Sequence, residues 1–140
     1  MGSPVYFFDV AAQLRAFMER CTSLMKAYWH TGHPHPPPDW SRTAAGALAI
    51  GSHRHGGQEH TCGTIINWFL TCGFVVVGSH SLREGPAGYI GGSAWQGAGD
   101  GHGVEGDRWG LEAARIVGQK VAKTALLLNA GAEVLEIGER

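Results

Sequence analysis

Apolar residues recur every three or four positions over residues 9–30, which is the spacing of one face of an α-helix. Asp9 stands at the start of this pattern, and its side chain is expected to cap the helix while Phe8 packs back onto the first turn. The apolar face that the spacing predicts consists of Val10, Leu14, Phe17, Met18, Cys21, Leu24, Met25 and Tyr28.

Short apolar runs and further helical patterns alternate along the rest of the chain. Residues 43–50 are rich in alanine and predict a strand with helices packed closely on both faces, and residues 74–77 predict a second buried strand. Helical spacing returns over residues 58–71 and over residues 107–128, where Gly118 is expected to allow a close approach. This alternation favours an α/β fold with parallel strands.

Glycine and proline dominate the segments between these elements. The proline-rich residues 31–39 cannot sustain a helix or a central strand. Residues 79–107 are expected to form a long glycine-rich loop, which a compact domain usually carries only for a functional reason. Residues 132–137 predict a frayed tail or a short strand. No internal repeat or linker divides the sequence, so we expect residues 1–140 to form a single domain.

The segment GSHRHGGQE, residues 51–59, stands between a predicted strand and a predicted helix, where open α/β sheets bind ligands. Gly56 and Gly57 lack a Cβ atom, so the backbone there can approach a flat ligand closely. The amides that open the following helix can donate to carbonyl or anionic groups. We expect Gln58 to hydrogen-bond a ligand carbonyl, whereas Glu59 is expected to stabilise the helix dipole.

A second segment, GSPVYFF at residues 2–8, brings aromatic side chains to the start of the first predicted helix. The two helix-opening turns could therefore form opposite walls of one cleft, one aromatic and one of bare glycine backbone. Such a cleft suits a planar heterocycle. The hypothesis requires Tyr6 and Gly57 to lie at the same end of the molecule.

Composition narrows the class of protein. The formal net charge of −1 gives no electrostatic reason to expect nucleic acid or an acidic membrane as a partner. The three cysteines are odd in number and have no C-x-x-C spacing, which favours reduced thiols and a cytoplasmic location. The sequence contains neither an apolar run of the roughly 18 residues that a membrane span needs nor an initial signal-peptide pattern.

Histidines offer a competing chemistry, because imidazole is a common metal ligand. No carboxylate or thiolate stands at a recognisable ligand spacing beside them, so solvated loop histidines are the favoured interpretation. A metal module remains an alternative, and its candidate ligands would be His30, His33, His35, His53, His55 and His60.

Four segments resemble, in order, motifs of the flavodoxin-like FMN proteins. Residues 3–6 match S-P-x-Y before a helix, and residues 56–61 match the G-G-Q-E-x-T flavin loop. Residues 72–78 resemble the next strand, and residues 99–122 resemble the final loop and helix. The chain is similar to the NADPH-dependent FMN reductases and to the NAD(P)H:quinone oxidoreductases of the tryptophan-repressor-binding type.

The resemblance implies an α/β fold, namely the C-terminal portion of a flavodoxin-like doubly wound parallel sheet with flanking helices. It also implies FMN as cofactor, NAD(P)H and a quinone-like acceptor as partners, and a homo-oligomer. No side-chain acid or base is required, because FMN carries the redox chemistry. The residues implied to hold the flavin are Ser3, Pro4, Val5, Tyr6 and Phe7 on one side, and Ser52, His53, Arg54, His55, Gly56, Gly57 and Gln58 on the other.

The sequence departs from the family pattern at its start. In that family the FMN phosphate sits in a loop after the first strand, and no segment here resembles that loop. We therefore expect a reading frame truncated at Met1, with a split protein or a degenerate copy as alternatives. The alternative function is a non-catalytic, partner-binding remnant that cannot hold FMN. A partial sheet would leave apolar surface uncovered, so the chain is expected to be marginally stable or to self-associate.

Overall fold

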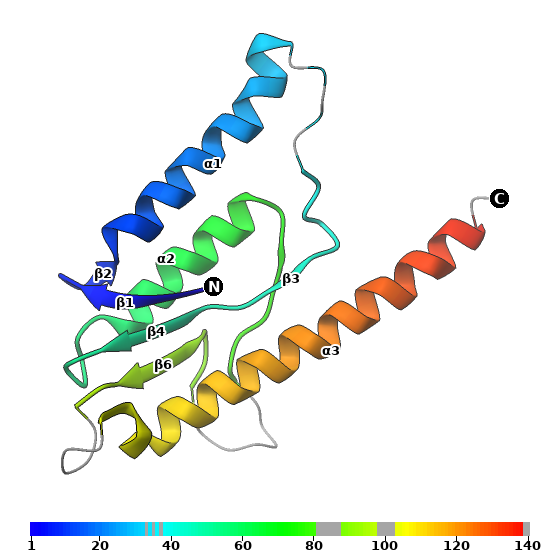
Figure 1. Cartoon of the computed structure of the whole chain (residues 1–140). Helices are drawn as coiled ribbons and strands as arrows, with labels where there is room; N and C mark the ends of the chain where they lie inside the picture. Colours follow the sequence, from blue (N-terminus) through cyan, green and yellow to red (C-terminus); the bar gives the residue numbers. More distant parts are fainter. Residues whose placement is uncertain (33, 35, 37, 81–87, 98–102, 139–140) are drawn as a thin grey trace.

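A computed structural model of the chain describes residues 1–32, 34, 36, 38–80, 88–97 and 103–138. Within them, a four-stranded sheet has the order β2-β1-β4-β6 (Figure 1). Its strands are β1 (Gly2–Tyr6), β2 (Asp9–Val10), β4 (Leu48–Gly51) and β6 (Gly92–Trp95). Strands β1, β4 and β6 run parallel, and β2 pairs antiparallel with β1. The predicted α/β fold with a parallel sheet is confirmed.

Helices cover both faces of the sheet. Helix α2 (Gln58–Thr71) and helix α3 (Arg108–Gly138) lie on opposite faces. Neighbouring residues of an extended chain point to opposite sides, and the neighbours Gly91 and Gly92 face different helices. A Cβ atom at Gly91 would lie 2.7 Å from the sulfur of Cys62 on α2, whereas one at Gly92 would lie 2.8 Å from Cα of Ala114 on α3. The arrangement is therefore doubly wound, as the sequence indicated.

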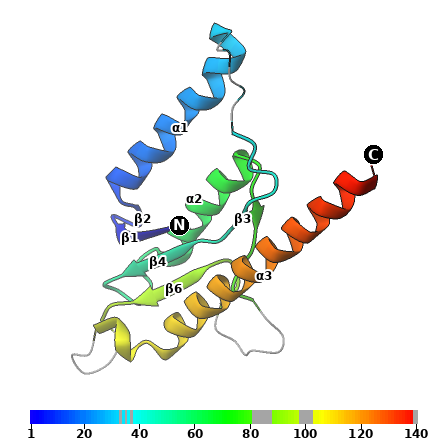
Figure 2. The same ribbon diagram turned by 45° about the vertical axis from the view of Figure 1, so that its right-hand side comes forward.

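Helix α1 (Ala12–Thr31) lies beside α2 (Figures 1 and 2). The indole of Trp68 on α2 donates a hydrogen bond of 3.2 Å to the carbonyl oxygen of Met18 on α1. The main core lies under these helices, where alanines of the strands leave room for larger helical side chains. Its buried members are Val10, Ala45, Ala47, Ala49, Cys62, Ile65 and Phe69.

The first helix does not begin at Asp9, so the predicted cap is wrong. Phe7 and Phe8 have positive φ angles of 47° and 73°, and they turn the chain back so that Asp9 pairs with Tyr6 in the β1–β2 hairpin. Ala11 precedes the helix and makes no side-chain cap. The Asp9 carboxylate instead accepts hydrogen bonds from the backbone N–H of Val10 and from two side chains, those of Arg15 and Thr64.

The alanine-rich run at residues 43–50 forms two strands rather than one. Strand β3 (Ala44–Ala45) pairs in parallel with β5 (Val75–Val76), while β4 joins the larger sheet. Gly46 lies between them, directly under α3, and a Cβ atom there would lie 2.5 Å from Cγ1 of Val117. The close approach that the sequence assigned to Gly118 therefore belongs to Gly46, since a Cβ atom at Gly118 would meet nothing within 4 Å.

Two further expectations are corrected in the C-terminal half. The predicted loop at residues 79–107 contains β6 and the short 3-10 helix η1 (Gly103–Gly106). Residues 132–137, expected as a tail or a strand, belong to α3, which continues to Gly138. The described helices include none that is both long and apolar enough to cross a membrane.

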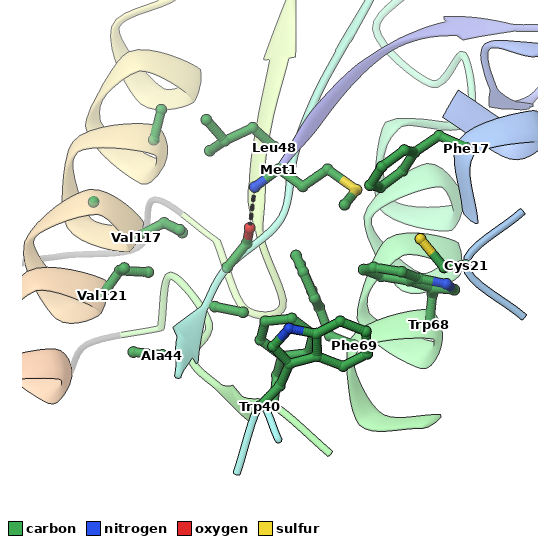
Figure 3. Close-up of a pocket in the computed structure, with 15 residues that line it drawn as sticks. Met1, Phe17, Cys21, Trp40, Ala44, Leu48, Trp68, Phe69, Val117 and Val121 are labelled. Atoms are coloured by element: carbon green, nitrogen blue, oxygen red, sulfur yellow. Dashed lines mark hydrogen bonds between the residues drawn. The ribbon is translucent and has the colours of Figure 1, made fainter. Parts of the chain in front are cut away.

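An apolar groove of about 540 Å³ lies between the α1–α2 pair and α3 (Figure 3). Leu48 remains 37% exposed and Phe17 51% exposed at this groove. The C-terminal half of α3 extends beyond the sheet (Figures 1 and 2) and exposes further apolar side chains. The groove is lined by Met1, Phe17, Cys21, Trp40, Ala44, Ala45, Gly46, Leu48, Trp68, Phe69, Phe74, Ala114, Val117, Gly118 and Val121.

Candidate functional site

The two turns singled out in the sequence meet at the carboxyl edge of the sheet. They follow β1 and β4, which are adjacent and parallel, so the strand ends lie side by side. Gly57 has a φ angle of 107°, and a Cβ atom there would lie 2.7 Å from the carbonyl oxygen of Phe8 and 2.8 Å from its Cα. Glycine is therefore needed at residue 57 both for its backbone conformation and for this contact. The condition set for the cleft hypothesis is met.

The hairpin tip presents aromatic side chains to solvent. Tyr6, Phe7 and Phe8 are all exposed, although aromatic residues of this size are usually buried at least in part. Phe7 and Phe8 also adopt left-handed backbone conformations, which cost of order 1–3 kcal/mol each for such residues. Strained backbone of this kind clusters at ligand sites, so the tip has the character of a binding wall.

Two other predicted site residues of this segment face inward. The Ser3 hydroxyl is buried, accepts a hydrogen bond of 2.9 Å from the N–H of Ala11 and donates one of 2.7 Å to the carbonyl oxygen of Pro4. It therefore joins β1 to the residue that precedes α1. Val5 packs against the core, whereas Pro4 is exposed.

The glycine loop, residues 52–57, is exposed at Ser52, His53, Arg54 and His55. The carboxamide of Gln58 holds this loop from beneath. Its oxygen accepts a hydrogen bond of 2.9 Å from the N–H of Gly56, and its nitrogen donates to the carbonyl oxygen of His53. Gln58 is only 5% exposed, and both ends of its carboxamide are hydrogen-bonded to the loop. The ligand contact expected of this side chain stays a prediction.

Trp95 is a site residue that the sequence interpretation missed, because its strand was assigned to a loop. The indole Nε1 donates a hydrogen bond of 3.0 Å to the carbonyl oxygen of Ser52. The guanidinium of Arg54 lies over the indole ring, 4.5 Å from its centroid. The N–H of Trp95 donates to the Asp107 carboxylate at 2.7 Å, which anchors the residue in turn. Trp95 thus ties the loop after β4 to the end of β6.

Asp9 supports the site from the other side. Burial alone would raise the pKa of this carboxyl group, but hydrogen bonds from Val10 and Thr64 and the charge of Arg15 outweigh it, so the pKa of Asp9 lies below its ordinary value. Arg15 Nη2 lies 2.6 Å from the carboxylate and Thr64 Oγ1 lies 2.8 Å away. Asp9 therefore fastens the hairpin to both α1 and α2.

Metal and thiolate chemistry finds little support in the described part of the chain. Those residues contain no group of three or more His, Cys, Asp or Glu side chains that could hold a metal ion. His33 and His35 lie outside the described residues, and so does the side chain of His30. Burial raises the pKa of the Cys62 thiol, which keeps it protonated near neutral pH.

Comparison with known proteins gives consistent results. Residues 1–86 match the family model of the NADPH-dependent FMN reductases. An iron-sulfur flavoprotein of Methanocaldococcus jannaschii is 36% identical over 130 residues, covering 92% of this chain and 58% of that protein. An NAD(P)H dehydrogenase (quinone) of Caulobacter vibrioides is 34% identical over 139 residues, covering 92% of this chain and 63% of that protein.

The chain spans about three fifths of the length of these curated relatives, at 58% and 63%. The match to residues 1–86 contains both turns of the candidate site, and the doubly wound sheet agrees with a flavodoxin-like fold. FMN, the cofactor that the motifs implied, is the cofactor for which the family is named. The chain belongs to the NADPH-dependent FMN reductase family.

Proposed function

We propose that this chain binds FMN at the two turns and passes electrons from NAD(P)H to a quinone or a similar acceptor. The contact between Gly57 and Phe8 carries the proposal, because it holds the exposed aromatic tip of the hairpin against the glycine loop. An aromatic wall suits the face of a flat ring system, and glycine lets the loop backbone come close to it. The family name and the name of the Caulobacter relative both point to a nicotinamide nucleotide as the donor, and the name of the relative adds a quinone as the acceptor.

Each wall has a separate task in this proposal. Pro4, Tyr6 and Phe7 cover one side of the isoalloxazine ring, and the glycine loop holds the other and hydrogen-bonds the pyrimidine edge through backbone amides. FMN, when bound, supplies the hydride and electron chemistry, and the protein supplies orientation and electrostatics. Gln58, Trp95 and Asp9 act indirectly, because they fix the positions of the two walls.

The test is FMN titration of the full chain, followed by flavin absorbance and by quenching of flavin fluorescence. A matched glycine pair makes the test specific. Gly57→Ala should abolish measurable binding, because the new Cβ would meet the Phe8 backbone at 2.7 Å. Gly63→Ala on α2 should bind as the wild type does, because a Cβ there meets nothing within 4 Å. Wild-type protein that binds no FMN would overturn the proposal.

A second candidate function is a partner-binding module that does not hold FMN. The uncovered apolar groove favours it, since contiguous exposed apolar surface usually marks an interaction site. Two measurements made after the titration separate the functions. NAD(P)H oxidation by a quinone in the presence of FMN supports the reductase, whereas protein that stays colourless and forms complexes supports the module. Under either function we propose that the chain forms a homo-oligomer.

A further inference from the structure

A second cavity, of about 830 Å³, is bordered by both flavin turns and extends from them to the end of β6 and the start of α3. Phe8 and Gly57 form its edge toward the turns, and Trp95 and Trp109 contribute aromatic surface on the side of β6 and α3. Ligand pockets in proteins usually enclose about 300–1,000 Å³, so this cavity can take a molecule of nucleotide size. Its position places any bound molecule next to the ring site proposed for FMN.

Two arginines line this cavity, and each lies against a tryptophan. The guanidinium of Arg54 lies 4.5 Å from the ring centroid of Trp95, and that of Arg108 lies 5.3 Å from the ring centroid of Trp109. Arginine beside an aromatic face is suited to recognise a planar group that carries a phosphate, because the guanidinium binds the anion while the ring stacks. Trp109 is 50% exposed, which leaves ring surface free for stacking.

The cavity also contains carboxylates, and their surroundings decide its charge. Asp107 accepts hydrogen bonds from the backbone N–H groups of Trp95 and Gly110, at 2.7 and 3.0 Å, so its charge is used within the protein. Glu59 is exposed at the first turn of α2, where a carboxylate stabilises the positive end of the helix dipole. The exposed guanidinium groups of Arg54 and Arg108 are therefore the cationic groups best placed for an incoming anion.

We propose that this cavity binds the phosphate-bearing end of a nucleotide, with Arg54 and Arg108 on the phosphates and Trp109 stacked on the base. The proposal rests on the proposed function, because that function gives the nucleotide its role as the adenosine-phosphate end of the NAD(P)H donor. The site adjoins the flavin turns through Phe8 and Gly57, so the rest of the dinucleotide has a short path to the ring.

The test uses the flavin-free full chain and ADP as the probe, with binding measured by calorimetry and by the indole N–H signals in NMR spectra. ADP should bind and should shift the indole signals of Trp95 and Trp109, while that of Trp68, which lies in the apolar groove, stays in place. Arg108→Gln should raise the Kd at least about tenfold, as the loss of one charge-assisted hydrogen bond implies. Arg54→Gln should have a similar effect.

Arg20→Gln, an exposed arginine on α1, is the matched control and should leave the Kd unchanged. The proposal is overturned if ADP does not bind, if Arg108→Gln binds as the wild type does, or if inorganic pyrophosphate binds as tightly as ADP without moving the Trp109 signal. The last result would mean an anion site without base recognition. A parallel FMN titration separates the two proposals: FMN binding without ADP binding removes this site alone, and ADP binding without FMN binding removes only the reductase function.

Discussion

Trp95 and Ser52 are joined by a hydrogen bond of 3.0 Å across 43 residues of sequence, from the indole Nε1 to the carbonyl oxygen. The bond links the carboxyl ends of β4 and β6, and it fixes the first residue of the glycine loop. Gln58 holds the middle of the loop and Trp95 holds its start, so the shape of the loop depends in part on a residue from another strand. FMN affinity is therefore expected to respond to substitutions that do not touch the cofactor.

Trp95→Phe should weaken FMN binding by about fivefold. Phenylalanine keeps most of the ring but cannot donate to Ser52, and one hydrogen bond contributes about 1 kcal/mol. Fluorescence titration with FMN measures the effect. Trp109→Phe is the control, because no hydrogen bond joins the Trp109 indole to this loop; equal Kd values for the two variants would contradict the role given to Trp95.

Gln58→Ala should lower the free energy of unfolding by about 2 kcal/mol. The substitution removes the two hydrogen bonds between the carboxamide and the N–H of Gly56 and the carbonyl oxygen of His53, which keep their bond of 3.2 Å to each other. Each lost hydrogen bond costs about 1 kcal/mol. Urea unfolding followed by circular dichroism gives the value. Gln13→Ala, at an exposed residue of α1, should change stability by less than about 0.5 kcal/mol; the same small change in Gln58→Ala would refute the bracing role.

Asp9→Asn should destabilise the protein at neutral pH, and the difference should vanish in acid. The pKa of Asp9 is lowered in the folded state, so the carboxylate contributes stability above its unfolded pKa of about 3.9 and loses it as pH falls through the folded value. We expect about 1 kcal/mol at pH 7, because the carboxylate is partly exposed. Thermal unfolding of both proteins between pH 7 and pH 3 checks the convergence. A difference that does not depend on pH would show that the charge is irrelevant.

Gly46→Ala should destabilise the protein by about 1–3 kcal/mol, the usual cost of overpacking. The new Cβ would lie 2.5 Å from Cγ1 of Val117 and would push α3 away from β3. Gly118→Ala, on the same helix, is the matched control and should stabilise by about 0.5–1 kcal/mol, because a Cβ there meets nothing and alanine favours the helix. Thermal melts that rank the two variants in the opposite order would contradict this packing.

The chain should self-associate at micromolar concentration, since the groove and the end of α3 leave apolar surface uncovered. Sedimentation velocity over a dilution series measures the association. Leu48→Gln, within the groove, should shift the equilibrium toward monomer, whereas Leu111→Gln, at an exposed position outside it, should not. A dilute wild-type monomer with a cooperative melt would count against this expectation.

Sequence patterns predicted the elements that carry strong local signals. The bounds of α2, Gln58–Thr71, agree with the prediction because Gly57 marks its start and its apolar face is regular. Strand β6 was missed because Gly92, Ser93 and Ala94 are small, and they suit a strand only where helices press on both faces. The role of Asp9 was misassigned because the left-handed turn at Phe7 and Phe8 is unusual for phenylalanine and leaves no pattern in the sequence.

The sequence likewise predicted only part of the candidate site. The glycine and aromatic segments could be identified because residue type alone limits what such backbone and side chains do. The supporting contacts of Gln58 and Trp95 could not, because they depend on which strand lies beside which. Distances across the sheet are set by the fold as a whole, so no local sequence pattern indicates them.

The groove between α2 and α3 contains Trp40 and Trp68, two of the five tryptophans of the chain (Figure 3). Indole emission depends on the polarity around the ring, so polypeptide or detergent that covers this surface will shift the intrinsic fluorescence of the chain. The protein thus carries a built-in optical reporter of its own assembly, and no external dye is needed to follow it.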